Sequence, residues 1–154
     1  MARLKFIEDK DIIRRRNSLA PYIPFKDFGA TGEFSTYPNF TICVTDEKAE
    51  ELIDAGYKIK DYVNKDGDVF HQLKINARFD NIPPKVFEIP EGKRRKIQLD
   101  GESIVDLQNM DIVEFEGSVS LSKGGACYLA SGYFTVARNP IDDKYSFDEE
   151  DELE

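Results

Sequence analysis

The chain lacks several residue types on which enzymes most often depend. Its 154 residues include no tryptophan, one histidine (His71) and two cysteines, Cys43 and Cys127, which are 84 positions apart. Two distant thiols and one imidazole fall short of the ligand set of a zinc site, and the sequence contains no GxSxG, P-loop or GxGxxG motif. We therefore expect no metal, no cofactor and no enzymatic activity, and two buried thiols rather than a disulfide.

Long apolar runs are also missing. No run approaches the ~18 residues that a membrane span requires, and the first residues, MARLKFIEDKD, carry acids where a secretory signal needs an apolar stretch. The sequence thus predicts a cytoplasmic protein without a membrane partner. Hydrophobic residues at 40% and charged residues at 33% are typical of a globular domain, and the length fits one such domain.

Negative charge is present in excess but is unevenly distributed. The formal net charge is −9, and residues 142–154 contain eight acids and one lysine, a net of −7, which leaves −2 on the rest. We therefore expect two regions: a nearly neutral folded domain over residues 1–141 and a disordered acidic C-terminal tail over residues 142–154.

Short β-branched and aromatic runs separated by turn residues predict a mainly β fold. The expected strands cover residues 3–7, 40–44, 57–63, 69–80, 86–89, 93–99, 111–121 and 127–138. Two short helices interrupt them, one over 47–55 capped by Thr45 or Asp46 and one after Asp100. Strands at this spacing favour an antiparallel Greek-key barrel, closed or partly closed, that resembles the oligonucleotide/oligosaccharide-binding (OB) fold.

The alternation within residues 69–80 is the clearest strand signal. Its odd positions are mostly apolar and include Leu73, Ile75 and, as a buried histidine, His71, whereas Phe70, Lys74 and Arg78 occupy even positions. One face should therefore be buried and the other exposed.

Cations and aromatic rings alternate on the expected exposed faces. Lys58, Lys60 and Tyr62 share one strand face, and the Asp66-Gly67 turn should pair that strand with Phe70, Lys74 and Arg78. Proteins that bind single strands combine cations that follow the phosphates with rings that stack on bases. The alternative is an ordinary solvated strand face.

Two further charged segments have two interpretations each. Lys93, Arg94, Arg95 and Lys96 suit a hairpin that grips phosphates or an edge strand protected from aggregation by its charge. The tail suits a solubilising extension. Because aromatic rings lie among its acids, it also suits a mimic of a nucleic-acid strand. Such a mimic would occupy the chain's own cationic groove or a basic pocket on a partner. The tail residues concerned are Asp142, Asp143, Tyr145, Phe147, Asp148, Glu149, Glu150 and Asp151.

Carboxylates near Asp111 suggest a rival function. Asp111, Glu114 and Glu116 lie close together, and metal-dependent nucleases use acidic clusters. Surface alternation along a strand explains the same residues, and no histidine or lysine motif accompanies them.

The order of these elements resembles the bacteriophage single-stranded DNA-binding proteins. The resemblance is carried by Asn39-Phe40 with its strand, the helix from Ala49 to Gly56, Lys58-Ile59-Lys60, Pro83-Pro84, Val105-Asp106-Leu107, Gly124-Gly125, Tyr128-Leu129 and the tail. It implies an OB fold and sequence-independent binding of single-stranded DNA during phage DNA replication or recombination in the bacterial cytoplasm. It also implies that the tail regulates binding and recruits replication or recombination proteins. Such tails often end in an aromatic residue, whereas here seven residues follow Phe147.

The leading hypothesis is thus a non-enzymatic single-stranded DNA-binding protein. Tyr62, Phe70 and Tyr128 would stack on bases, and Lys58, Lys60, Lys74, Arg78 and Lys93–Lys96 would hold phosphates. The alternative is an acidic protein-interaction module, a nucleic-acid mimic that binds a basic partner protein. The sequence leaves the oligomeric state open, a homodimer included.

Overall fold

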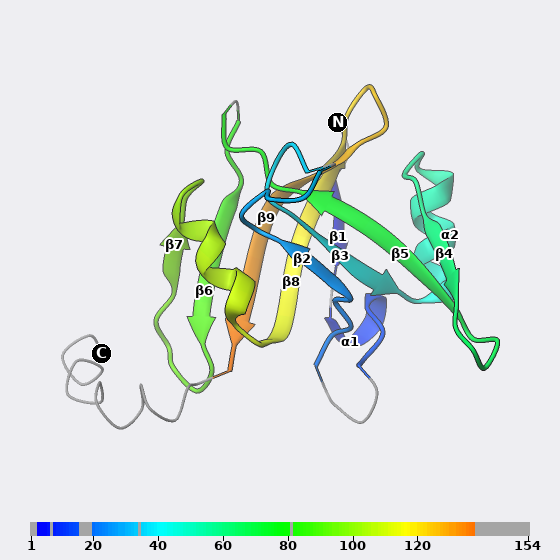
Figure 1. Ribbon diagram of the computed structural model, residues 1–154, viewed down its shortest axis with the longest axis horizontal. Helices are drawn as coiled ribbons and strands as arrows, with labels where there is room; N and C mark the ends of the chain where they lie inside the picture. Colours follow the sequence, from blue (N-terminus) through cyan, green and yellow to red (C-terminus); the bar gives the residue numbers. More distant parts are fainter. Residues whose placement is uncertain (1–2, 7, 16–19, 34, 81, 138–154) are drawn as a thin grey trace.

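The computed structural model describes residues 3–6, 8–15, 20–33, 35–80 and 82–137 (Figure 1). The tail predicted for residues 142–154 lies outside them. No helix in the described part of the chain is long and apolar enough to cross a membrane. The elements, in order, are β1 (Arg3–Phe6), α1 (Glu8–Asp11), β2 (Phe25–Asp27), β3 (Asn39–Val44), α2 (Asp46–Asp54), β4 (Lys60–Val63), β5 (Val69–Asn76), β6 (Lys85–Pro90), β7 (Ile97–Leu99), the 3-10 helix η1 (Ser103–Asn109), β8 (Ile112–Leu121) and β9 (Cys127–Val136).

The mainly β class is confirmed, and the nine strands in the described part of the chain form one mixed, open sheet. The main path is β1-β8-β9-β5-β3-β2, with β4 added to β5 and the β6–β7 hairpin added to β9. Most pairs are antiparallel, but β9 runs parallel to β6 and, at Asn76 and Tyr128, to β5. The sheet is therefore not the wholly antiparallel barrel that was expected. Strand periodicity fixes which side chains share a face, whereas strand direction depends on crossovers such as η1 between β7 and β8.

Local sequence signals set the start of α2 and the turn between β4 and β5. Thr45 caps α2, since its hydroxyl accepts a hydrogen bond from the Lys48 amide at 3.2 Å. Gly67 in the β4–β5 turn has φ of +85°, a conformation that favours glycine. The turn is closed by the Asn64 side chain, which accepts from the Asp66 and Asp68 amides. These contacts make β4 and β5 a regular hairpin.

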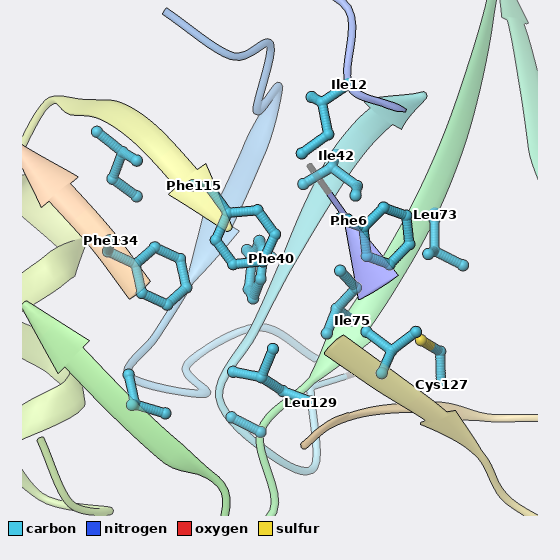
Figure 2. Close-up of a cluster of buried hydrophobic side chains, with 14 of the residues drawn as sticks. Phe6, Ile12, Phe40, Ile42, Leu73, Ile75, Phe115, Cys127, Leu129 and Phe134 are labelled. Carbon is cyan, nitrogen blue, oxygen red and sulfur yellow. The ribbon is translucent and has the colours of Figure 1, made fainter. Parts of the chain in front are cut away.

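The inward face of the sheet holds a cluster of phenylalanines (Figure 2). The rings of Phe40, Phe115 and Phe134 lie 4.9–5.4 Å apart and are fully buried. Leu73 and Ile75 pack into the same core, as the alternation in residues 69–80 predicted. Cys43 and Cys127 are free and buried, as expected, and burial raises the pKa of the Cys43 thiol to about 11.

The same alternation was wrong for its first positions. Val69 is 50% exposed, and His71 is partly exposed rather than a core residue. The β4–β5 hairpin extends to the right in Figure 1, and burial of the odd positions of β5 begins only at Leu73. The odd-numbered side chains of this strand are therefore buried only where a second layer of the fold packs against them.

Candidate nucleic-acid interface

The outward face of β5 carries the polar and aromatic residues that the sequence placed at even positions. Strand register sets Tyr62 of β4 opposite Phe70, Lys60 opposite Gln72 and Thr41 of β3 opposite Lys74. Partners in an antiparallel pair point to the same side. We call this surface the outer strip and define it as Lys60, Tyr62, Phe70, Gln72, Lys74 and Asn76.

Three rings gather at the β4 end of the outer strip. The Phe70 ring meets Tyr62 at 6.5 Å in a tilted arrangement and Tyr22 at 5.6 Å edge to face. Tyr62 remains 54% exposed although it touches another ring. An exposed aromatic surface of this kind can stack on unpaired bases.

Two lysines flank these rings. Lys60 and Lys74 are exposed, and neither forms an ion pair with any residue that the structure describes. Their positive charge is therefore directed to solvent, beside the exposed ring of Tyr62, and is able to neutralise the phosphates of a bound strand.

A second group of rings and a cation lies where β5 meets β9. The Arg78 guanidinium lies 5.4 Å from the Tyr37 ring centre, and Tyr37 lies 6.1 Å from the ring of Tyr128. Tyr128 is the register partner of Asn76 and so continues the outer strip onto β9. We call Arg78, Tyr37 and Tyr128 the Arg78 cluster.

Arg78 already has an acidic partner. Its Nε donates to Asp80 Oδ1 at 2.6 Å. This hydrogen bond is the main reason why the pKa of Arg78 is raised, and the Tyr128 hydroxyl makes a smaller contribution. A phosphate would therefore compete with Asp80 for the same guanidinium.

The outer strip is long enough for several nucleotides. Phe70 and Asn76 are six residues apart on one strand, which corresponds to roughly 20 Å at ~3.3 Å per residue. Proteins with OB folds contact ~4–16 nucleotides per domain. A surface of this length with rings at one end and the Arg78 cluster at the other suits a segment of single strand.

The β4–β5 hairpin is fastened to α2 by His71. Its Nδ1 lies 2.7 Å from Asp61 Oδ1 on β4, and its Nε2 lies 2.8 Å from Asp46 Oδ1 at the start of α2. The hydrogen bond to Asp61, followed by that to Asp46, raises the pKa of His71 although partial burial opposes the change. His71 thus has a structural contact to each neighbour instead of a core position.

Residues 20–28 are held against the sheet edge by polar contacts that no sequence pattern predicted. Lys26 Nζ donates to the carbonyl oxygens of Met110 at 2.6 Å and Leu107 at 3.2 Å, and burial lowers the pKa of Lys26. The Gln108 side chain donates a hydrogen bond to the Lys26 carbonyl oxygen and accepts one from the Phe28 amide. These bonds fix the chain that carries Tyr22 and half-exposed Phe25 to the outer face.

Other predicted site residues lie away from the outer strip. β4 begins only at Lys60, and Lys58 instead lies near the β8–β9 turn, where a Cβ built on Gly125 would be 3.1 Å from Lys58 Cε. The shared strand face proposed for Lys58, Lys60 and Tyr62 is therefore wrong for Lys58. A residue outside the regular strand does not follow its alternation.

Lys93–Lys96 lie in the β6–β7 connection, on the opposite side of Figure 1 from the β4–β5 hairpin. Arg95 is half-buried, and its charge partly offsets the desolvation that raises the pKa of buried Glu88. Lys96 Nζ lies 4.8 Å from the ring centre of Phe87 and 5.8 Å from that of Tyr133, and these rings stack at 5.2 Å. Lys93 is half-buried and Arg94 exposed. This run is a separate surface, distinct from the outer strip.

The carboxylates near Asp111 do not converge. Asp111 accepts from Arg15 at 3.2 Å, and Glu114 and Glu116 lie on the outward face of β8. In the described part of the chain, no group of three or more His, Cys, Asp or Glu side chains is placed to hold a metal ion.

Sequence reasoning missed Tyr22, Phe25 and Tyr37. All three lie in residues 21–38, where prolines and glycines remove any periodicity that would assign a face. The density of aromatic residues in that segment was the one available signal.

Comparisons with known proteins bring no further information. No protein-family model, curated protein or solved structure matches the chain significantly. The resemblance to phage single-stranded DNA-binding proteins therefore rests on the order of the sequence elements and on the acidic tail alone.

Proposed function

We propose that this protein binds single-stranded DNA without sequence preference and acts in phage DNA replication or recombination. The observation that carries the proposal is the outer strip, where the exposed ring of Tyr62 and the partly buried ring of Phe70 lie beside two lysines that form no ion pair with any described residue. These side chains follow β4 and β5 toward the Arg78 cluster. Cations beside stacking surfaces favour binding that tolerates any sequence, because every base has a face on which a ring can stack.

Charge distribution supports the same function. A net charge of −9 would repel DNA if it were spread over the whole surface, but residues 142–154 account for −7 of it. The domain that carries the outer strip is therefore nearly neutral, and local cations can dominate there.

The acidic tail would modulate this binding. Its carboxylates and its two rings, Tyr145 and Phe147, combine the charge and the stacking capacity of a nucleic-acid strand. We expect the tail to compete for the outer strip and to recruit replication or recombination proteins.

Binding of a fluorescent oligo-dT, followed by anisotropy at several salt concentrations, tests the proposal. We expect the full chain to bind with a log–log salt slope of about −0.7 per phosphate contact, and a truncation after Ile141 to bind more tightly. If neither form binds at low salt, the proposal fails and a protein-interaction module becomes the better hypothesis.

A further inference from the structure

A cleft opens beside the Arg78 cluster. Its volume is about 660 Å3, within the range of sites that accept small ligands. One wall comes from β8, β9 and the turn between them, and includes Tyr128 and Ala130. The other wall comes from the connection between β5 and β6, which includes Ile82, and from Lys85 at the start of β6.

The cleft is continuous with the outer strip. Arg78 and Tyr128 belong both to the Arg78 cluster and to the cleft lining. Because Tyr128 is the register partner of Asn76, a strand that follows β5 to its end arrives at the mouth of the cleft. In Figure 1, β5 ends near the point where β9 begins.

The charge of the lining is unusual for this protein. The chain has 30 acidic and 21 basic residues, yet the described lining contains Arg78 and Lys85 and no aspartate or glutamate. Asp80, which pairs with Arg78, is not among the residues that line the cleft. The cleft is thus electrostatically complementary to an anionic ligand.

The remaining lining suits a flat, partly apolar group. Ile82 is 83% exposed, the largest exposed fraction among the described large hydrophobic residues, and Pro83 and Leu121 extend the apolar surface. The Tyr128 ring and the serine hydroxyls of Ser120 and Ser131 add a stacking surface and polar partners. A base attached to its phosphate combines these properties in one ligand.

We infer that the cleft holds one nucleotide of the bound single strand, with its base between Tyr128 and Ile82 and its phosphate near Arg78 and Lys85. This inference rests on the proposed function and adds a specific subsite to it. The bound single strand would leave β5 at the end of the outer strip and enter the cleft there.

Filling the cleft tests the inference. Ala130→Trp in the full chain adds a side chain within the cleft, and Thr135→Trp is the matched control, since Thr135 lies on the same strand outside the lining. We expect Ala130→Trp to weaken oligo-dT binding by about 5- to 100-fold, the loss of one stacked base, and Thr135→Trp to leave it unchanged.

A second variant distinguishes a loss of binding at the cleft from a loss of folding. Ile82→Ser changes an exposed side chain and should leave the urea unfolding midpoint unchanged while weakening oligo-dT binding. If wild type binds, Phe70→Ala weakens binding and both cleft variants bind like wild type, the cleft inference is overturned while the proposed function stands. If wild type itself does not bind oligo-dT, the proposed function fails first.

Discussion

The two faces of the sheet are both rich in aromatic residues, but their rings have different surroundings. On the inward face, Phe40, Phe115 and Phe134 contact one another and are fully buried. On the outward face, Phe70, Tyr62 and Tyr128 lie beside Lys60, Lys74 and Arg78. A ring surrounded by other apolar groups stabilises the fold, whereas a ring beside an exposed cation is available to a ligand.

The largest expected difference between the faces is in stability. Phe134→Ala should lower the free energy of unfolding by about 3–5 kcal/mol, because it leaves a cavity in the core. Tyr133→Ala, one residue away on the outward face and 37% exposed in the native protein, should cost about 1 kcal/mol or less. Urea unfolding measures both, and equal losses would contradict the division of roles between the faces.

The reverse pattern is expected for DNA binding. Phe70→Ala should weaken oligo-dT affinity by about 5- to 100-fold, because a stacking surface is lost. Val69→Ala changes the neighbouring residue on the other face and should leave affinity unchanged. Anisotropy titration of both variants, with circular dichroism to verify folding, makes the comparison. Equal effects at the two positions would remove the outer strip as the binding surface.

The lysines of the outer strip should set the salt dependence. Lys74→Gln should reduce the magnitude of the log–log salt slope by about 0.7, the contribution of one phosphate contact to a single strand. Lys65→Gln, in the β4–β5 turn, serves as the control for loss of one positive charge elsewhere. A slope that changes equally in both variants would indicate only a general effect of net charge.

His71 should make the outward hairpin sensitive to pH. Because the folded-state pKa of His71 is raised above 6.5 by its two aspartate partners, the protonated residue stabilises the fold. This contribution is complete below pH 6.5 and is lost as the pH rises through the raised pKa. The urea midpoint of wild type should therefore fall from pH 5.5 to pH 8.5, and by less in His71→Asn. An identical fall in both proteins would exclude His71 as the source.

The smallest expected effect is an increase in affinity. Asp80→Asn removes the carboxylate that competes for Arg78, and should tighten oligo-dT binding by about 2- to 5-fold, in the range of an exposed ion pair. Glu47→Gln, an exposed acid on α2, is the matched loss of negative charge. Tighter binding in Asp80→Asn alone would place a phosphate at Arg78, and no change would leave Arg78 outside the DNA contact.

Much of the fold could be predicted because its signals are local. The Asp66-Gly67 turn, the Thr45 cap and the alternation at Leu73 and Ile75 each depend on neighbouring residues, and each was confirmed. The same alternation predicted that Phe70 and Lys74 of the candidate site share the outward face of β5. Lys58 and His71 were misjudged because strand ends and the limits of the core depend on distant parts of the chain.

The sequence by itself determined the class of fold, the two faces of β5 and the separation of charge between domain and tail. These properties follow from the two-residue period of a strand and from composition. The tertiary structure alone decided that β9 runs parallel to β5 and β6, that Tyr22 and Tyr37 reach the outer face, and that Arg78 and Tyr128 border a cleft. Those arrangements join residues up to about ninety positions apart, as Tyr37 and Tyr128 are, and no local pattern records which distant segments pack together.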